Sequence, residues 1–251
     1  MKFLGASIIS SKVVSFLFLN LTLLISYLTV LKITKTKYNL FFPTKKKLNI
    51  LKPKTINKYL KVKKPKYVIH LAGLSRPMKI HRKNIRKSID LNIIGTANIT
   101  KVCCELGIKL IYFSTTYVYP GFKGNYKETS PLLPKNNYSW SKLGGESSVH
   151  MYKNSLILRV CMTEKPFAHK KALCDAKTSF MYQDEVAKIL LKLLNEKGIL
   201  NVGGKSQSIY NFAKIENPKV KKIFLKKNKK IKMPINSSIN IEKMKKILKK
   251  T

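Results

Sequence analysis

The sequence predicts an α/β protein in which helices flank a Rossmann-like parallel sheet, followed by a small C-terminal lobe. Two observations indicate this class. Short apolar runs bounded by small residues alternate with segments of helical spacing between residues 53 and 203. A chain of 251 residues, 44% of them apolar, is also long enough to build one substantial core. Such alternation favours parallel strands joined by right-handed helical crossovers.

Each element follows from its local sequence. Pro53 introduces the first predicted helix, and Gly107 and Gly198 close two later ones as C-terminal caps. The predicted strands are buried apolar runs, and they cover residues 66–73, 108–114, 155–160 and 199–203. The predicted helices have apolar residues at helical spacing, and they cover residues 54–63, 90–106, 137–151 and 183–196.

The charge of the chain is extreme. Lys and Arg number 51 against 11 Asp and Glu, a formal net charge of +40. Only four of the basic residues are Arg, the side chain suited to bidentate reading of bases and phosphates. We therefore expect no specific nucleic-acid partner, and a compositional bias toward Lys explains the charge better. The four Cys show no CxxC spacing, so we expect no metal site and a cytoplasmic protein with reduced thiols.

The N-terminal segment has two interpretations. Residues 13–31 carry no charge, and their length fits one membrane-spanning helix. A buried helix followed by a buried strand, as in the first βαβ unit of a nucleotide-binding sheet, has a similar composition. We favour the second interpretation, because the strands that follow require such a unit, and we keep membrane contact as the alternative.

The pair Tyr138 and Lys142 carries the clearest chemistry. The two residues lie four positions apart, on one face of the predicted helix. A nearby cation favours the phenolate and lowers the Tyr pKa, which suits proton transfer to or from a carbonyl or alcohol. The same spacing occurs at four places in this Lys-rich chain, so it becomes specific only through context. Here the helix follows a strand whose end, residues 114–119, is rich in hydroxyls, where an α/β sheet places ligand-facing groups.

Five motifs in order give a family resemblance. They are His70-Leu71-Ala72-Gly73, Asp90-Leu91-Asn92-Ile93-Ile94-Gly95-Thr96, Ser114-Thr115-Thr116-Tyr117-Val118-Tyr119, Tyr138-x-x-x-Lys142 and Leu158-Arg159-Val160. The chain resembles the extended short-chain dehydrogenase/reductases of the NAD-dependent epimerase/dehydratase superfamily, and most of all their dTDP-4-dehydrorhamnose reductase branch. The resemblance implies a nucleotide-binding domain over residues 1–160, atypical over 1–47. It also implies a reduced substrate-binding lobe and Lys-rich tail over 161–251, from which residues 183–203 return to the sheet.

The resemblance also implies roles for individual residues. Tyr138 would be the general acid/base, Lys142 would lower its pKa and hold the nicotinamide ribose, and Thr115 would bind the substrate carbonyl. Asn92 would also support the helix that carries Tyr138. The expected cofactor-binding residues are Gly5, Ser7, Ala72, Gly73, Asn92, Ser114, Tyr138 and Lys142. The expected substrate-binding residues are Ser75, Thr116, Tyr117 and Arg159. For Arg159 two roles stay open, a satisfied structural residue or a ligand of the substrate phosphates.

The chain departs from the family at the cofactor end. In the candidate glycine motif at residues 5–11, Ile8 and Ser11 stand where glycines are expected. No acid precedes Asp90, so the acid that would bind the adenosine ribose is missing and NADP is favoured over NAD. Thr116 replaces the usual Asp of the strand end.

The expected function is an NAD(P)-dependent reductase of a nucleotide-linked 4-keto-6-deoxy sugar, in which Tyr138 delivers the proton. The alternatives are a nucleotide-sugar epimerase or dehydratase of the same superfamily and a cofactor-impaired homologue that binds a sugar nucleotide without catalysis. A further alternative is a basic binding protein, and a homodimer stays open.

Overall fold

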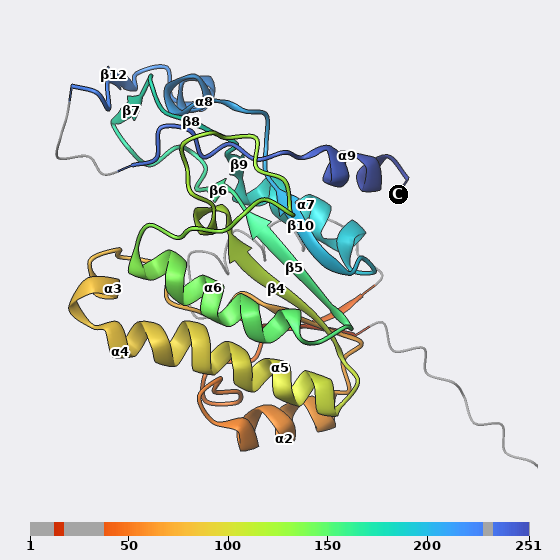
Figure 1. The fold of residues 1–251 in the computed structure, drawn as a ribbon. Coiled ribbons are helices and arrows are strands. Elements are labelled where there is room, and N and C mark those ends of the chain that lie inside the picture. The colour runs from red at the N-terminus through yellow and green to blue at the C-terminus, as the bar shows by residue number, and fades with distance from the viewer. Residues whose placement is uncertain (1–12, 18–37, 228–232, 251) are drawn as a thin grey trace, which may run out of the picture.

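Six parallel strands form the central sheet of the computed structural model, which describes residues 13–17, 38–227 and 233–250 (Figure 1). Their spatial order is β10-β5-β4-β3-β1-β2, and every neighbouring pair is parallel. The strands are β1 (Val13–Leu17), β2 (Asn39–Phe41), β3 (Tyr67–His70), β4 (Lys109–Thr115), β5 (Ser155–Val160) and β10 (Gly198–Val202). The parallel sheet with flanking helices confirms the predicted fold class.

Helices cover both faces of this sheet. One face carries α2 (Pro53–Lys63), α5 (Gly95–Glu105) and α6 (Asn137–His150) (Figure 1). The other carries α7 (Gln183–Leu190), a 3-10 turn η3 (Leu191–Leu193) and α9 (Glu242–Lys249). Strand β4 shows how the sequence builds the two cores, because alternate side chains point to opposite faces. Leu110 and Tyr112 join the α2/α5/α6 core, whereas Ile111 and Phe113 join the α7 core.

Short elements after β3 lead the chain toward α6. They are α3 (Ile80–Lys83), α4 (Ile85–Ser88) and the π-helical turn η1 (Ile89–Ile94), which runs directly into α5. After β4, the 3-10 turn η2 (Thr116–Val118) begins the loop that reaches α6. Gly107 has φ +67° at the end of α5, as its predicted role as a C-terminal cap requires.

A small lobe with its own core follows β5. Its elements are β6 (Met162–Thr163), β7 (Lys171–Leu173), β8 (Lys177–Thr178), β9 (Met181–Tyr182), β11 (Gln207–Ser208), α8 (Ile209–Glu216) and β12 (Lys221–Ile223). Phe167, Leu173, Tyr182 and Phe212 pack together in this core. The last described segment then returns to the sheet, where Lys243 Nζ of α9 donates to the Ile199 carbonyl of β10 at 2.7 Å.

Two predicted helices differ in detail from the observed ones. The helix expected over 90–106 starts as the π-helical turn η1 before it becomes α5. The helix expected over 183–196 ends at Leu190, and the chain tightens into η3. Helix ends often tighten in this way, because their last carbonyls lack partners further along the helix.

The start of the uncharged N-terminal run lies in the parallel sheet, as the favoured interpretation expected, but as a strand where a helix was expected. Val13–Leu17 is neither the start of a buried helix nor of a membrane-spanning one, but strand β1, paired with β2 and β3. An uncharged run rich in β-branched and aromatic residues suits a buried parallel strand as well as a helix, so composition alone did not separate the two. The remainder of the predicted span, residues 18–31, lies outside the described residues. Among the helices that the structure describes, none is long and apolar enough to cross a membrane.

Candidate active site

One face of α6 carries three candidate functional side chains. Tyr138, Lys142 and Glu146 are spaced four residues apart, so they lie one turn above another. The helix begins with a capping box, in which Asn136 Oδ1 accepts from the Ser139 amide at 2.9 Å. This cap fixes Tyr138 in the first turn, next to the carboxyl end of β4. Lys142 and Glu146 are buried, at 8% and 3% exposure, while Tyr138 is half-buried.

Burial favours the protonated form of the Tyr138 hydroxyl, and two neighbouring groups oppose it. Burial raises the pKa of Tyr138, while a hydrogen bond with the Thr115 side chain and the positive charge of Arg76 lower it. The Tyr138 ring centroid is 5.1 Å from that of His81 and 6.4 Å from that of Tyr117. The sequence-based expectation was a pKa lowered by Lys142, and the structure corrects it: burial dominates, and the cation that opposes burial is Arg76. A phenol with a raised pKa suits a proton donor.

Lys142 is buried against an aromatic ring. Its Nζ lies 4.2 Å from the centroid of the Tyr112 ring, a cation–π distance. Burial lowers the pKa of Lys142 to about 7, and the negative charge of Glu146 opposes that shift. Beneath the lysine, His70 is fully buried and its Nε2 is 3.0 Å from Thr96 Oγ1. Burial and the Lys142 charge lower the pKa of His70 to about 3, so this imidazole is neutral at physiological pH.

Asn92 ties the loop after β3 to α6. Its Oδ1 accepts from the Leu74 amide at 2.6 Å, and its Nδ2 donates to the Leu74 carbonyl at 2.9 Å and to Ser141 Oγ at 2.8 Å. The π-helical turn η1 presents Asn92 at this point, and such turns are frequent at functional sites. A Cβ on Gly73 would lie 2.8 Å from Asn92 Oδ1, so the loop passes the amide too closely for a larger residue.

A buried ionic network lies behind this site. Glu146 Oε1 accepts from Arg159 Nη2 at 2.6 Å and from Nε at 3.0 Å, and Glu146 Oε2 accepts from Ser114 Oγ at 2.6 Å. Arg159 Nη1 donates to Tyr119 Oη and to the Glu128 carbonyl, both at 2.9 Å. The guanidinium is 3% exposed and committed to these partners, which favours the structural role for Arg159 over a phosphate contact. Ser114 likewise faces Glu146.

The remaining predicted substrate contacts divide between core and surface. Thr116 is 3% exposed, and its side chain hydrogen-bonds the buried Cys161 thiol, so it points into the protein. Tyr117 is half-buried beside Tyr138, and Ser75 is partly exposed in the loop after β3. Next to Ser75, the exposed Arg76 pairs with Glu164 of the small lobe at 2.7 Å. The structure therefore places Tyr117 and the charge of Arg76 near Tyr138, leaves Ser75 in the neighbouring loop and turns Thr116 away.

The nicotinamide end and the pyrophosphate end of the expected cofactor differ in how well the residues fit. The nicotinamide end fits the residues at the carboxyl ends of β3 and β4. The backbone at Gly73 passes close to Asn92, Ala72 is buried, and the Lys142 amine is available for a ribose hydroxyl. Gly5 and Ser7 lie outside the described residues. Ligand loops of a parallel sheet follow the carboxyl ends of its strands, whereas Gly5 and Ser7 precede β1. After β1, the sequence has no glycine until Gly73.

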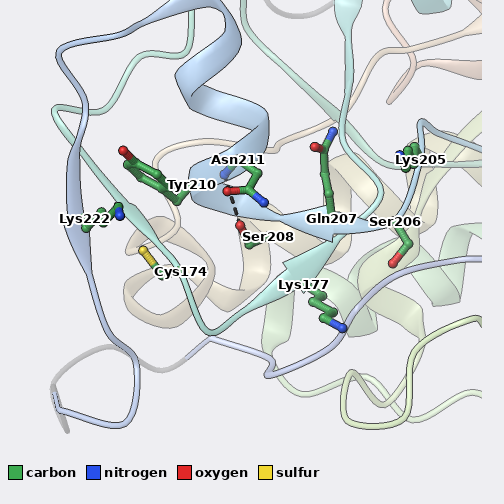
Figure 2. Close-up of a pocket in the computed structure, with 9 residues that line it drawn as sticks. All are labelled: Cys174, Lys177, Lys205, Ser206, Gln207, Ser208, Tyr210, Asn211 and Lys222. Carbon is green, nitrogen blue, oxygen red and sulfur yellow. Dashed lines mark hydrogen bonds between the residues drawn. The ribbon is translucent and has the colours of Figure 1, made fainter.

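A separate pocket opens in the small lobe. It has a volume of about 570 Å³ and lies around β11 and the start of α8 (Figure 2). Three lysines, Lys177, Lys205 and Lys222, contribute to its lining, with Cys174, Ser206, Gln207, Ser208, Tyr210 and Asn211. The lining contains no acid, so the pocket suits an anionic group, but it contains none of the residues around Tyr138.

Sequence reasoning missed two residues of the site. Glu146 shares the helix face of Tyr138 and Lys142, and that spacing could have identified it because the helix was predicted correctly. Arg76 lies one residue after the predicted Ser75, and its charge acts on both Tyr117 and Tyr138. No sequence pattern identified Arg76, since its position depends on how the loop after β3 folds back over α6.

The fold and the site define the class of this protein: it has the architecture of an extended short-chain dehydrogenase/reductase, with Thr115, Tyr138 and Lys142 at the carboxyl edge of the sheet. The family model described as RmlD substrate binding domain matches residues 29–164, more than half of the chain. The chain belongs to this family.

Curated relatives cover part of the chain. Methionine adenosyltransferase 2 subunit beta of Xenopus tropicalis is 33% identical over 114 residues, which are 45% of this chain and 34% of the relative. The spore coat polysaccharide biosynthesis protein SpsK of Bacillus subtilis is 30% identical over 125 residues, 49% of this chain and 44% of the relative. The matched region thus spans about a third to under half of the length of these relatives.

Solved structures share the fold over nearly the whole chain. The dTDP-4-dehydrorhamnose reductase of Bacillus anthracis in complex with NADP superposes with a TM-score of 0.78 at 20% identity, over 93% of this chain and 92% of that one. The WbmG enzyme of Bordetella bronchiseptica in complex with NAD gives 0.74 at 16% identity, over 96% of this chain and 89% of that one.

Proposed function

We propose that this chain is an NAD(P)-dependent reductase that acts on a nucleotide-linked 4-keto-6-deoxy sugar. The observation that carries the proposal is the hydrogen bond between Thr115 and Tyr138 at the carboxyl edge of the sheet, with the buried Lys142 one turn further along the same face of α6. A phenol kept protonated by burial, next to a hydroxyl and a buried amine, suits proton delivery to a carbonyl oxygen that gains a hydride. The related chain from Bacillus anthracis, a reductase in complex with NADP, supports the same reaction class.

The proposed division of labour follows from the positions of these residues. A bound nicotinamide would supply the hydride. Tyr138 would give its Oη proton to the carbonyl oxygen of the sugar, and Thr115, which already bonds Tyr138, would donate a hydrogen bond to that oxygen. Arg76, whose charge already lowers the Tyr138 pKa, and Lys142, one turn further along α6, would stabilise the phenolate left on Tyr138, because an opposite charge nearby favours the ionised phenol. We propose NADPH rather than NADH, since no acid precedes Asp90 to bind a free ribose 2′-hydroxyl.

The test combines binding and turnover. The purified chain is titrated with NADPH and NADH by calorimetry, then mixed with NADPH and dTDP-4-dehydrorhamnose while the reduced cofactor is followed by absorbance. We expect NADPH to bind more tightly and to be consumed with one equivalent of sugar reduced. Absence of NADPH binding at millimolar concentration would overturn the reductase proposal. A sugar converted with no net loss of NADPH would instead indicate the epimerase or dehydratase alternative.

A second candidate is a homologue that binds a sugar nucleotide or a partner protein without catalysis. The observation that favours it is the absence of any glycine between Gly5 and Gly73, which removes the usual close approach of backbone to pyrophosphate. A relative that matches 45% of this chain at 33% identity is named as a subunit, methionine adenosyltransferase 2 subunit beta, which is compatible with a role beside a partner protein. Calorimetry with dTDP alone separates the candidates: binding of dTDP together with no binding of NADPH favours this second function.

A further inference from the structure

Glu146 stands out among the acids of this chain. All eleven acidic residues lie in the described part, and Glu146 is the one whose side chain is buried, at 3% exposure. The chain carries a formal net charge of +40, so a buried carboxylate is an unusual use of a scarce residue. Burying an ionised carboxylate is costly unless it is paired and hydrogen-bonded.

Its partners meet that condition and hold it in place. Both oxygens of Glu146 are engaged, one by Arg159 through Nη2 at 2.6 Å and Nε at 3.0 Å, the other by Ser114 Oγ at 2.6 Å. Hydrogen bonds to charged donors stabilise the ionised form of a carboxylate. The carboxylate thereby links α6 to β4 and β5, and Ser114 directly precedes Thr115 of the site.

Lys142 lies one turn before Glu146 and needs a counter-charge. Lys142 is 8% exposed, and its ammonium lies over the Tyr112 ring of β4. From β3 it faces the neutral His70, and its own helix contributes the neutral phenol of Tyr138. From β5, the positively charged Arg159 contacts Glu146, which lies between it and Lys142 on the helix face. Glu146 is the negative charge in this set that opposes the effect of burial on Lys142.

We propose that Glu146 is a positioning residue that favours the ammonium form of Lys142 over the neutral amine, with Arg159 and Ser114 holding its carboxylate in place for that purpose. The inference rests on the proposed function, because the charge on Lys142 matters when Tyr138 gives up its proton. The charges of the Glu146–Arg159 pair do not cancel at Lys142, because the negative end acts on the lysine. Its negative end shares the helix face of the lysine, and its positive end lies beyond the carboxylate.

The first measurement reads Lys142 directly and needs no turnover. The pH dependence of Lys142 acetylation by trace acetic anhydride is followed by peptide mass spectrometry in the wild type and in Glu146→Gln. We expect the midpoint to fall by about one pH unit in the variant, which raises the reactive fraction about fivefold at one unit below the wild-type midpoint. Glu105→Gln, the same change on an exposed position of α5, should leave the Lys142 midpoint unmoved.

A second variant keeps the test decisive if Glu146→Gln does not fold, because that change leaves the Arg159 charge buried and unpaired. Glu146→Gln/Arg159→Met removes both charges and should still lower the Lys142 midpoint, by less than the single change. An unmoved or raised midpoint in a variant whose circular dichroism matches the wild type overturns the proposal.

Failure of the wild type to turn over a sugar would remove the reductase function and leave this labelling result intact. If turnover is found, the alkaline limb of kcat should move to lower pH in Glu146→Gln, with a smaller change in KM.

Discussion

Asn92 and Leu74 are bound to each other twice: the Asn92 amide accepts from the Leu74 N–H at 2.6 Å and donates to the Leu74 carbonyl at 2.9 Å. A side chain that satisfies both polar groups of one residue fixes that residue as a neighbouring strand would. Asn92 also donates to Ser141, so the loop after β3 and helix α6 share one anchor. The positions of Ser75 and Arg76 relative to Tyr138 depend on this anchor.

Asn92→Ala should therefore damage both stability and the site. Loss of these hydrogen bonds leaves the partly buried Leu74 groups without side-chain partners, and we expect the free energy of unfolding to fall by about 1–3 kcal/mol. Urea denaturation measures this, and the affinity for NADPH should fall with it. Asn98→Ala removes one bond, from Nδ2 to the Ile50 carbonyl, and is the matched control with a smaller expected loss. Equal effects of the two changes would contradict the anchoring role of Asn92.

Tyr138→Phe removes the proposed proton donor together with its hydrogen bond to Thr115. Its ring contacts with His81 and Tyr117 remain available, so the fold should be unchanged and the affinity for NADPH should change far less than kcat. General acid catalysis contributes typically about 10²–10⁴-fold, and we expect kcat to fall by an amount in that range. Tyr59, which also precedes a Lys by four residues but lies on α2, provides the control: Tyr59→Phe should keep full activity. Turnover of Tyr138→Phe at the wild-type rate would remove Tyr138 from the mechanism.

The strands and helices that build this site could be predicted from local sequence. Strand β5 has the predicted bounds, and α6 differs from its prediction by one residue, because apolar periodicity and caps are local signals. The juxtaposition of Tyr138 with Thr115 followed from the rule that ligand-facing groups gather at the carboxyl edge of a parallel sheet.

The electrostatics of the site could not be predicted in the same way. The pKa of Tyr138 depends on burial, which is a property of the packed loop after β3 and not of the spacing between Tyr138 and Lys142. The sequence left two roles open for Arg159, a structural residue or a phosphate ligand, because its partner Glu146 lies on another element. Only the packing of α6 on β5 joins the two residues. Strand β1 was missed since an uncharged run has no periodicity that separates a buried strand from a helix.

His70 should make the protein sensitive to acid. Burial and Lys142 lower its folded-state pKa to about 3, below the unfolded value of 6.5. The unfolded state therefore binds the proton first, so the stabilisation is complete above pH 6.5 and is lost as the pH falls toward 3. At pH 5 the loss should be about 2 kcal/mol, measured as a change in the urea midpoint between pH 7.5 and pH 5. His70→Gln should reduce this difference, whereas His150→Gln, at an exposed position, should not.

The two adjacent glycines of α6 should respond differently to the same change. A Cβ on Gly145 would strike the main-chain carbonyl oxygen of Asn92 and lie 2.8 Å from Tyr112 Oη, and neither the backbone nor the buried phenol can move aside easily. A Cβ on Gly144 would meet the end of the Ile93 side chain at 2.8 Å, and that side chain is only partly buried. Alanine gains about 1 kcal/mol over glycine inside a helix, so Gly144→Ala should stay within about 1 kcal/mol of the wild type.

For Gly145→Ala the clash should exceed that gain, since overpacking in a closed site costs about 1–3 kcal/mol or more and pushes α6 away from η1. Thermal denaturation of the two variants, side by side, gives the comparison, and the melting temperature of Gly145→Ala should be the lower by several degrees. Because η1 carries Asn92, the same variant should also bind NADPH more weakly than Gly144→Ala. A Gly145→Ala protein as stable as Gly144→Ala would mean that α6 and η1 do not pack as closely as the positions of Gly145 and Asn92 require.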